Sequence, residues 1–182
     1  MKGIIFTEFL DMVEERFGLA ATDRIIEAAA SATGGAYTAV GTYDHQEMVR
    51  MVAALSQEIG IPAADLARVY GQHLFGYFVR NHAEMFAGLN STFDFLAHVD
   101  GYIHVEVRKL YANAELPRFE ISAPTTATTM TMTYRSVRAL ADVAEGLMNG
   151  CAAHFGEQIE VRRSDLSGGQ GTVVEFILEK VS

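Results

Sequence analysis

Apolar side chains in the first half of the chain recur at intervals of three and four residues, which is the spacing of an amphipathic helix. The first such segment ends at Gly18. Thr22 is then a suitable N-cap for a second, alanine-rich helix that reaches Gly34. Asp44 begins a loose capping box and predicts a third helix that stops at Gly60.

Pro62 is the clearest break in the sequence, because proline fits the first turn of a helix but not its interior. A long helix is therefore expected from residue 63 to about residue 80, followed by two shorter helices at 92–99 and 101–111. The proline also marks a boundary between two lobes of a single domain, residues 1–182, with a helical lobe at 1–62 and a second lobe at 63–182.

The second half changes to β-branched residues that alternate with a period of two. One pair of strands is predicted at 118–123 and 126–135. After a helix at 139–155, a second pair is predicted at 158–163 and 172–179, joined by a glycine-rich turn. Many helices followed by β-β-α-β-β predict an α+β protein with an antiparallel sheet of about four strands.

Composition limits the classes of function. Apolar residues make up 49% of the chain and charged residues 20%, which is typical of a folded domain. The 14 lysines and arginines against 23 acidic residues give a formal net charge of −9, which argues against nucleic acid and anionic membrane as partners. No apolar run is long enough to span a membrane, and the single cysteine, Cys151, favours a reducing, cytoplasmic setting.

His104 is the histidine whose surroundings most favour ligand binding. It shares one helix face with Val107 and Tyr111, whereas Glu106 and Lys109 take the opposite side. An imidazole on an apolar face needs partners for its ring nitrogens, and a metal or a haem iron would serve. A structural histidine satisfied by the protein itself fits the same pattern.

A second candidate site lies at the end of an expected strand, where Tyr134, Ser136 and Arg138 alternate. In an extended chain these three side chains point to the same side. A phenol, a hydroxyl and a guanidinium there suit a ligand that carries carboxylates, with Arg138 as the charged anchor. The alternative is a solvated strand end whose alternation has no function.

Taken together, these residues resemble the haem-nitric oxide/oxygen binding (H-NOX) domains of the standalone bacterial type. The resemblance extends from residue 1 to about residue 180. It rests on the start Met1-Lys2-Gly3-Ile4-Ile5, on His104 followed by Val107, Lys109-Leu110-Tyr111 and Leu116-Pro117, and on Tyr134-x-Ser136-x-Arg138.

The resemblance implies a buried haem b, and the chain has no Cys-x-x-Cys-His motif for covalent attachment. His104 would be the axial iron ligand, and Pro117 would press on the porphyrin and distort it. The remaining implied contacts are Tyr134, Ser136 and Arg138 to the propionates, and Ile5, Leu147 and Phe78 packed on the haem.

The choice of gas depends on hydrogen-bond donors in the distal pocket. In the oxygen-binding members of the family, a tyrosine on the helix after the propionate motif donates to bound O₂. Val143 stands where that tyrosine is expected, so the sequence predicts an NO sensor that excludes stable O₂ binding. The other expected distal residues are the apolar Phe6, Phe9, Leu74 and Phe78, with Tyr70, Tyr77 and His73 facing elsewhere.

The family also implies a switch. NO would weaken the iron bond to His104 and free the helix that carries this histidine. The distorted haem would then relax against Pro117 and Ile5, and the N-terminal lobe would rotate. Replacing His104 by glycine should then lock the signalling state. The chain would not be an enzyme, and would act on a separate one, a histidine kinase first and a cyclic-di-GMP enzyme second.

Three other functions are open from the sequence. An oxygen or carbon monoxide sensor of the same fold would differ only in its ligand discrimination. A haem-free interaction module would use Tyr134, Ser136 and Arg138 to bind an acidic partner, and would purify colourless. A haem peroxidase would need a distal acid-base pair, which the apolar distal residues do not offer.

Overall fold

The computed structural model describes residues 1–122 and 125–181, and its elements follow the predicted order of helices and then strands. The α+β class and the four-stranded antiparallel sheet are confirmed. The first helices are α1 Gly3–Phe17, α2 Leu19–Ala28, α3 His45–Ile59 and α4 Ala63–Asn81. The later elements are the 3-10 helix η1 Ala83–Phe86, α5 Thr92–Ala97, the π-helix η2 Val99–Ile103, α6 His104–Leu110, β1 Arg118–Ser122, β2 Thr129–Arg135, α7 Ala141–His154, β3 Ile159–Asp165 and β4 Val173–Lys180.

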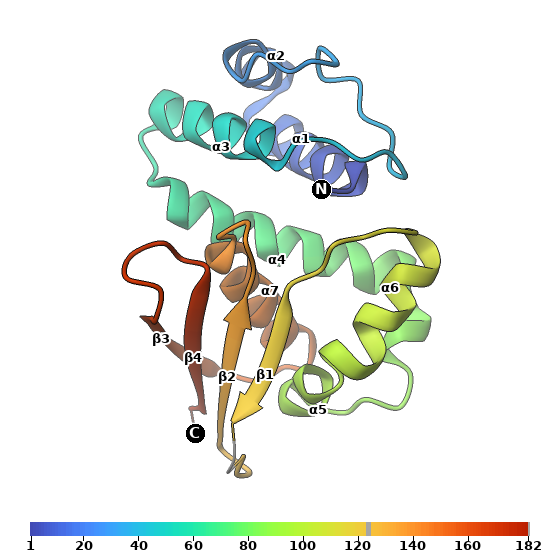
Figure 1. Cartoon of the computed structure of the whole chain (residues 1–182), viewed down its shortest axis with the longest axis vertical. Helices are drawn as coiled ribbons and strands as arrows, with labels where there is room; N and C mark the ends of the chain where they lie inside the picture. Colours follow the sequence, from blue (N-terminus) through green and yellow to red (C-terminus); the bar gives the residue numbers. More distant parts are fainter. Residues whose placement is uncertain (123–124, 182) are drawn as a thin grey trace.

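Helix α4 lies between two parts of the molecule (Figure 1). Helices α1, α2 and α3 stack on one side of it, whereas α7 and the sheet lie on the other. The first part has a core of buried apolar residues from α1–α3, to which α4 contributes Leu66, Tyr70 and Leu74. Phe75, on the same helix, belongs to the second core, and Leu147 of α7 packs against both.

The sheet has the strand order β1-β2-β4-β3, with every neighbouring pair antiparallel. Alternate residues of the two central strands point toward α7, as the period of two predicts. These inward-facing residues pair across the strands as Met130 with Leu178, Met132 with Phe176 and Tyr134 with Val174. The sheet therefore presents one apolar face to the helices.

The close approach of α4 to α7 depends on glycine. A Cβ atom placed on Gly146 would lie 2.1 Å from the carbonyl oxygen of Arg68, and one on Gly71 would lie 2.3 Å from the carbonyl oxygen of Val143. Side chains at these two positions would force the helices apart. The short separation brings Val143 and Leu147 of α7 next to α4, where both line the pocket described below.

The prediction for α2 was wrong at both ends. Gly18 adopts φ 82° and turns the chain so sharply that α2 begins at the next residue. Thr22 is consequently inside the helix, where its hydroxyl donates to the carbonyl of Gly18, and is not the N-cap. The helix ends at Ala28 and not near Gly34, because Ala30 takes a left-handed conformation with φ 47°.

The other helix ends follow the sequence more closely. The Asp44 carboxylate caps α3 by accepting from the backbone N–H of Gln46 at 3.0 Å. The predicted single helix at 101–111 instead starts as a π-helix, in which the N–H of Ile103 donates to the carbonyl of His98, five residues back, at 3.0 Å. Within the residues described, no helix combines the length and the apolarity needed to cross a membrane.

Candidate functional site

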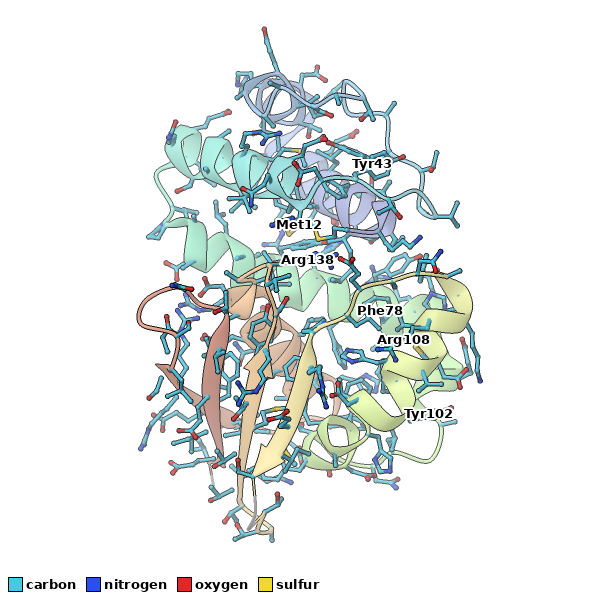
Figure 2. The ribbon with its side chains drawn as sticks, in the orientation of Figure 1. Met12, Tyr43, Phe78, Tyr102, Arg108 and Arg138 are labelled. Carbon is cyan, nitrogen blue, oxygen red and sulfur yellow. The ribbon has the colours of Figure 1, made fainter. Side chains whose placement is uncertain are left out.

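An apolar pocket lies where α4, α6, α7 and the sheet meet, and the start of α1 adds to its wall. Its lining comes from residues as far apart in sequence as Met1 and Met148. Figure 2 shows Phe78 below α4, on the side of the sheet and α6, and Arg138 at the end of the sheet nearest the upper helices. The pocket brings together the expected iron ligand and the expected haem contacts, which are Ile5, Phe78, His104, Pro117, Tyr134, Ser136, Arg138 and Leu147.

His104 is placed on the pocket wall by the step from the π-helix to α6. Its side chain is buried, and the residue is 9% exposed. Nδ1 lies 2.8 Å from a carboxylate oxygen of Asp100. The second oxygen of Asp100 accepts from the backbone N–H of Phe119 at 3.0 Å, so one carboxylate links the histidine helix to strand β1.

The electrostatics of His104 favour a neutral imidazole. Burial lowers the pKa of His104, and Asp100 opposes that effect only in part. The Asp100 carboxylate accepts a hydrogen bond from Nδ1–H and thereby selects the tautomer with a free Nε2 lone pair. Nε2 has no hydrogen-bond partner among the described residues, so it is the atom left for a ligand.

Sequence reasoning missed Asp100. The available signal was an aspartate four residues before the histidine, a spacing that brings two side chains together on a helix, although Asp100 lies one residue before the helix predicted at 101–111. Asp100 lies within the π-helix η2 and His104 directly follows it, and the π-helical backbone preserves the contact.

Tyr134, Ser136 and Arg138 converge on the pocket for a different reason from the one predicted. Strand β2 ends at Arg135, so the three residues do not alternate along an extended chain. A turn follows instead, in which the Ser136 hydroxyl accepts from the backbone N–H of Arg138 at 3.2 Å. The phenol of Tyr134 accepts from the backbone N–H of Leu140 at 3.0 Å and ties the end of the turn to the strand.

The Arg138 guanidinium, whose side chain is only 14% exposed, is already bound to a carboxylate. Nη1 donates to the carbonyl oxygen of Glu115 at 2.6 Å, and Nη2 donates to the Glu115 carboxylate. The amino group of Met1 lies nearby and donates to the carbonyl of Tyr43 at 2.6 Å. Burial lowers the pKa of that amino group, and the positive charge of Arg138 lowers it further.

The opposite part of the pocket is apolar, with Leu74, Phe78, Val143 and Leu147 in its lining. The prediction that Phe6 and Phe9 line it was wrong. Both are fully buried in the first core, because the pocket faces the first turn of α1, where Ile4 and Ile5 lie, and not the turns that follow.

Three polar side chains near this region stay out of the pocket lining. The phenol of Tyr70 donates to the carbonyl oxygen of Ile5 at 2.5 Å. The ring of His73 lies 3.5 Å from the Glu8 carboxylate, between α4 and α1. Tyr77 also lies outside the lining. The residues of α4 and α7 that line the pocket therefore carry no hydroxyl or imidazole.

The donor set fits a haem. The imidazole of His104 lines an apolar pocket, where it suits an iron centre. The guanidinium of Arg138 and the hydroxyls of Tyr134 and Ser136 lie at the polar end of the pocket, where they suit two propionates. The described residues contain no group of three or more histidine, cysteine, aspartate or glutamate side chains that could hold a metal ion by themselves. A single imidazole suits an iron that brings its other four ligands with it.

Comparison with known proteins agrees with this geometry. The profile of the Haem-NO-binding family matches residues 2–163. No curated protein sequence matches the chain. The fold is similar to that of the Fe(II) unliganded H-NOX protein from K. algicida, with 39% identity, a TM-score of 0.94, and coverage of 100% of this chain and 97% of that one.

Two further structures match over the whole chain. An IWP-051-bound H-NOX from Shewanella woodyi in the Fe(II)CO state has 35% identity and a TM-score of 0.82, with 95% of that chain covered. An H-NOX protein from S. oneidensis in the Fe(II)NO state has 26% identity and a TM-score of 0.91, with 100% of that chain covered. Domains of this family are haem-based gas sensors and not enzymes. The chain therefore belongs to the haem-NO-binding, or H-NOX, family.

Proposed function

We propose that this gas-sensor domain binds haem b through Nε2 of His104 and responds to nitric oxide. The observation that carries the proposal is the single buried imidazole on the wall of an apolar pocket, with its Nδ1 held by Asp100. One axial imidazole leaves the other side of the iron open to a diatomic gas. A carboxylate behind the ring increases its basicity as a ligand and fixes its orientation.

The remaining contacts divide between the polar and apolar parts of the pocket. Arg138, Ser136 and Tyr134 would bind the two propionates, whose burial without partners would be costly. Arg138 already binds one carboxylate in this geometry, which supports that role. The residues that would pack against the macrocycle are Pro117, Ile5, Leu147 and Phe78.

Selectivity for NO follows from the apolar distal wall. Bound O₂ is stabilised by a hydrogen-bond donor, whereas NO needs none. Val143, Leu74 and Phe78 supply no donor, and the phenol of Tyr70 is occupied by the Ile5 carbonyl. We therefore expect NO binding without a stable oxygen complex.

The signal would pass from His104 to the chain. Haem, when bound, would supply the gas-binding position, and we expect NO binding there to release His104. His104, once released, would loosen α6, and Asp100 would carry that change to Phe119 at the start of β1, two residues beyond Pro117. The lobe at residues 1–62 would then rotate against the lobe at 63–182, and a partner would recognise the altered surface.

The partner would be a separate signalling protein. A histidine kinase, and therefore two-component signalling, is our first choice, and a cyclic-di-GMP enzyme is the second. The single cysteine supports a cytoplasmic location.

Histidine replacement tests the proposed iron ligand. His104→Gly should purify with little haem, and added imidazole should restore the haem absorption spectrum by filling the space left by the side chain. His98→Gly is the matched control, because His98 lies six residues earlier, is bound to Asp94 and does not line the pocket. Wild-type haem content and spectrum in His104→Gly without imidazole would refute the assignment.

A further inference from the structure

We propose that Glu115 weakens haem retention by competing with a haem propionate for Arg138. The inference rests on the proposed function, because it assigns to Arg138 a carboxylate ligand that is not part of the chain. It identifies Glu115, which lies outside the Tyr134-x-Ser136-x-Arg138 motif, as a residue that sets the haem affinity of the polar end of the pocket. The carboxylate of Glu115 is thus a stand-in for the carboxylate that the pocket binds.

The two contacts between Glu115 and Arg138 have different roles. Nη1 of Arg138 is held by the backbone carbonyl of Glu115, at 2.6 Å. Nη2 is held by the side-chain carboxylate. A propionate that approaches the guanidinium can displace the carboxylate from Nη2, while the carbonyl continues to orient the group through Nη1.

The surroundings of Glu115 allow that exchange. Its side chain is 79% exposed, whereas the Arg138 side chain is 14% exposed, so the carboxylate can return to water but the guanidinium cannot. Glu115 lies in the loop between α6 and β1, two residues after the left-handed Asn113, φ 62°, and two residues before Pro117, where the loop ends. The backbone of the loop is therefore anchored at both sides of Glu115.

The negative charge of Glu115 also lowers haem affinity through electrostatics, in addition to competition for Arg138. The amino group of Met1 lies close enough to Arg138 to be affected by its charge, and Lys2 also lines the pocket. Glu115 is the acidic residue in the pocket lining, and it offsets part of this positive charge. After displacement from Nη2, its carboxylate would still lie close to the propionate, and like charges repel. Both effects predict that Glu115 lowers haem affinity.

The test is haem affinity, measured by competition between the purified haem-loaded protein and a calibrated haem-binding protein. Glu115→Gln keeps the shape and the backbone carbonyl but removes the charge. Because a partly exposed ion pair contributes at most about 1 kcal/mol, Glu115→Gln should bind haem about two- to fivefold more tightly than the wild type. Equal or weaker binding would overturn the proposal, since the carboxylate would then be neutral or would serve to orient Arg138.

Three controls separate this role from a general effect. Glu120→Gln removes the carboxylate from the nearby surface pair with Arg135, which is outside the pocket, and should leave haem affinity unchanged. In an Arg138→Ala background, Glu115→Gln should change affinity by less than twofold. Haem dimethyl ester, whose propionates are uncharged, should bind wild type and Glu115→Gln equally; a persisting difference with the ester would refute competition for a carboxylate. Failure of the proposed function would look different, because no variant would then take up haem.

Discussion

Replacing Gly146 by alanine tests the packing that holds α4 and α7 together beside the pocket. The new Cβ atom would lie 2.1 Å from the carbonyl oxygen of Arg68 and 2.9 Å from its Cα. These are backbone atoms of another helix, so no side-chain rotation relieves the overlap. The helices must separate, and Val143 and Leu147 would move with α7.

The size of the effect is the difference between two opposing terms. Alanine in place of glycine in a helix interior gains about 1 kcal/mol of helix propensity. Overpacking a closely packed core costs about 1–3 kcal/mol, and a clash with backbone belongs at the upper end of that range. We therefore expect Gly146→Ala to lower the free energy of unfolding by about 2 kcal/mol, which is a fall in Tm of about 4–8 °C for a chain of this size.

The assay is urea unfolding followed by circular dichroism, with Gly76→Ala as the matched control. Gly76 lies in the interior of α4, but a Cβ there would meet only the end of the flexible Arg80 side chain, at 3.2 Å. That variant should be stabilised by up to about 1 kcal/mol. If Gly146→Ala were as stable as Gly76→Ala, the helices would not be as close as the geometry requires, and the reasoning would be wrong.

Two further predictions concern tyrosines beside the pocket. Tyr70→Phe removes the hydrogen bond to the Ile5 carbonyl and should lower the free energy of unfolding in urea by about 1 kcal/mol; an unchanged unfolding midpoint would show that this bond contributes nothing. Burial raises the pKa of Tyr111 to about 12. The stability that the protonated Tyr111 contributes is therefore present below about pH 10 and is lost as the pH rises toward 12. In an alkaline titration followed by tyrosinate absorbance, wild type and Tyr111→Phe should therefore coincide up to about pH 10.5, and an extra tyrosinate in the wild type near pH 10 would contradict the assignment.

The sequence predicted those parts of the fold that depend on local patterns. Alternation predicted the strand at 126–135 that contains β2, and Asp44 with Gly60 delimited α3, because both signals act within a few residues. The limits of α2 were not predictable from caps alone. The positive φ of Gly18 starts that helix early, and a left-handed alanine, for which propensity gives no signal, ends it.

In the candidate site, too, some residues could be predicted from the sequence and others could not. His104, Arg138 and Val143 were identified by motif position, and the structure brings all three to one pocket. The partners that control them, Asp100 and Glu115, were missed. The spacing of four residues between Asp100 and His104 was a usable signal, whereas Glu115 meets Arg138 across 23 positions, and that contact depends on backbone geometry that residue spacing does not encode.

The exclusion of Phe6 and Phe9 from the pocket has the same origin. Both have the helical periodicity of core residues, and periodicity does not say which of two cores a helix face will meet. Only the packing of α1 on α4 decides that Ile4 and Ile5 face the pocket while the two phenylalanines face away.

The central claim is that a His104-bound haem in an apolar pocket responds to NO and not to O₂. The most direct measurement is the absorption spectrum of the purified, reduced protein under argon, in air and with NO. We expect a haem spectrum that does not change in air and that shifts with NO to the form in which the imidazole ligand is lost. A stable oxygen complex in air would contradict the assignment of the distal wall, and a protein that stays colourless after haem is supplied would contradict haem binding itself.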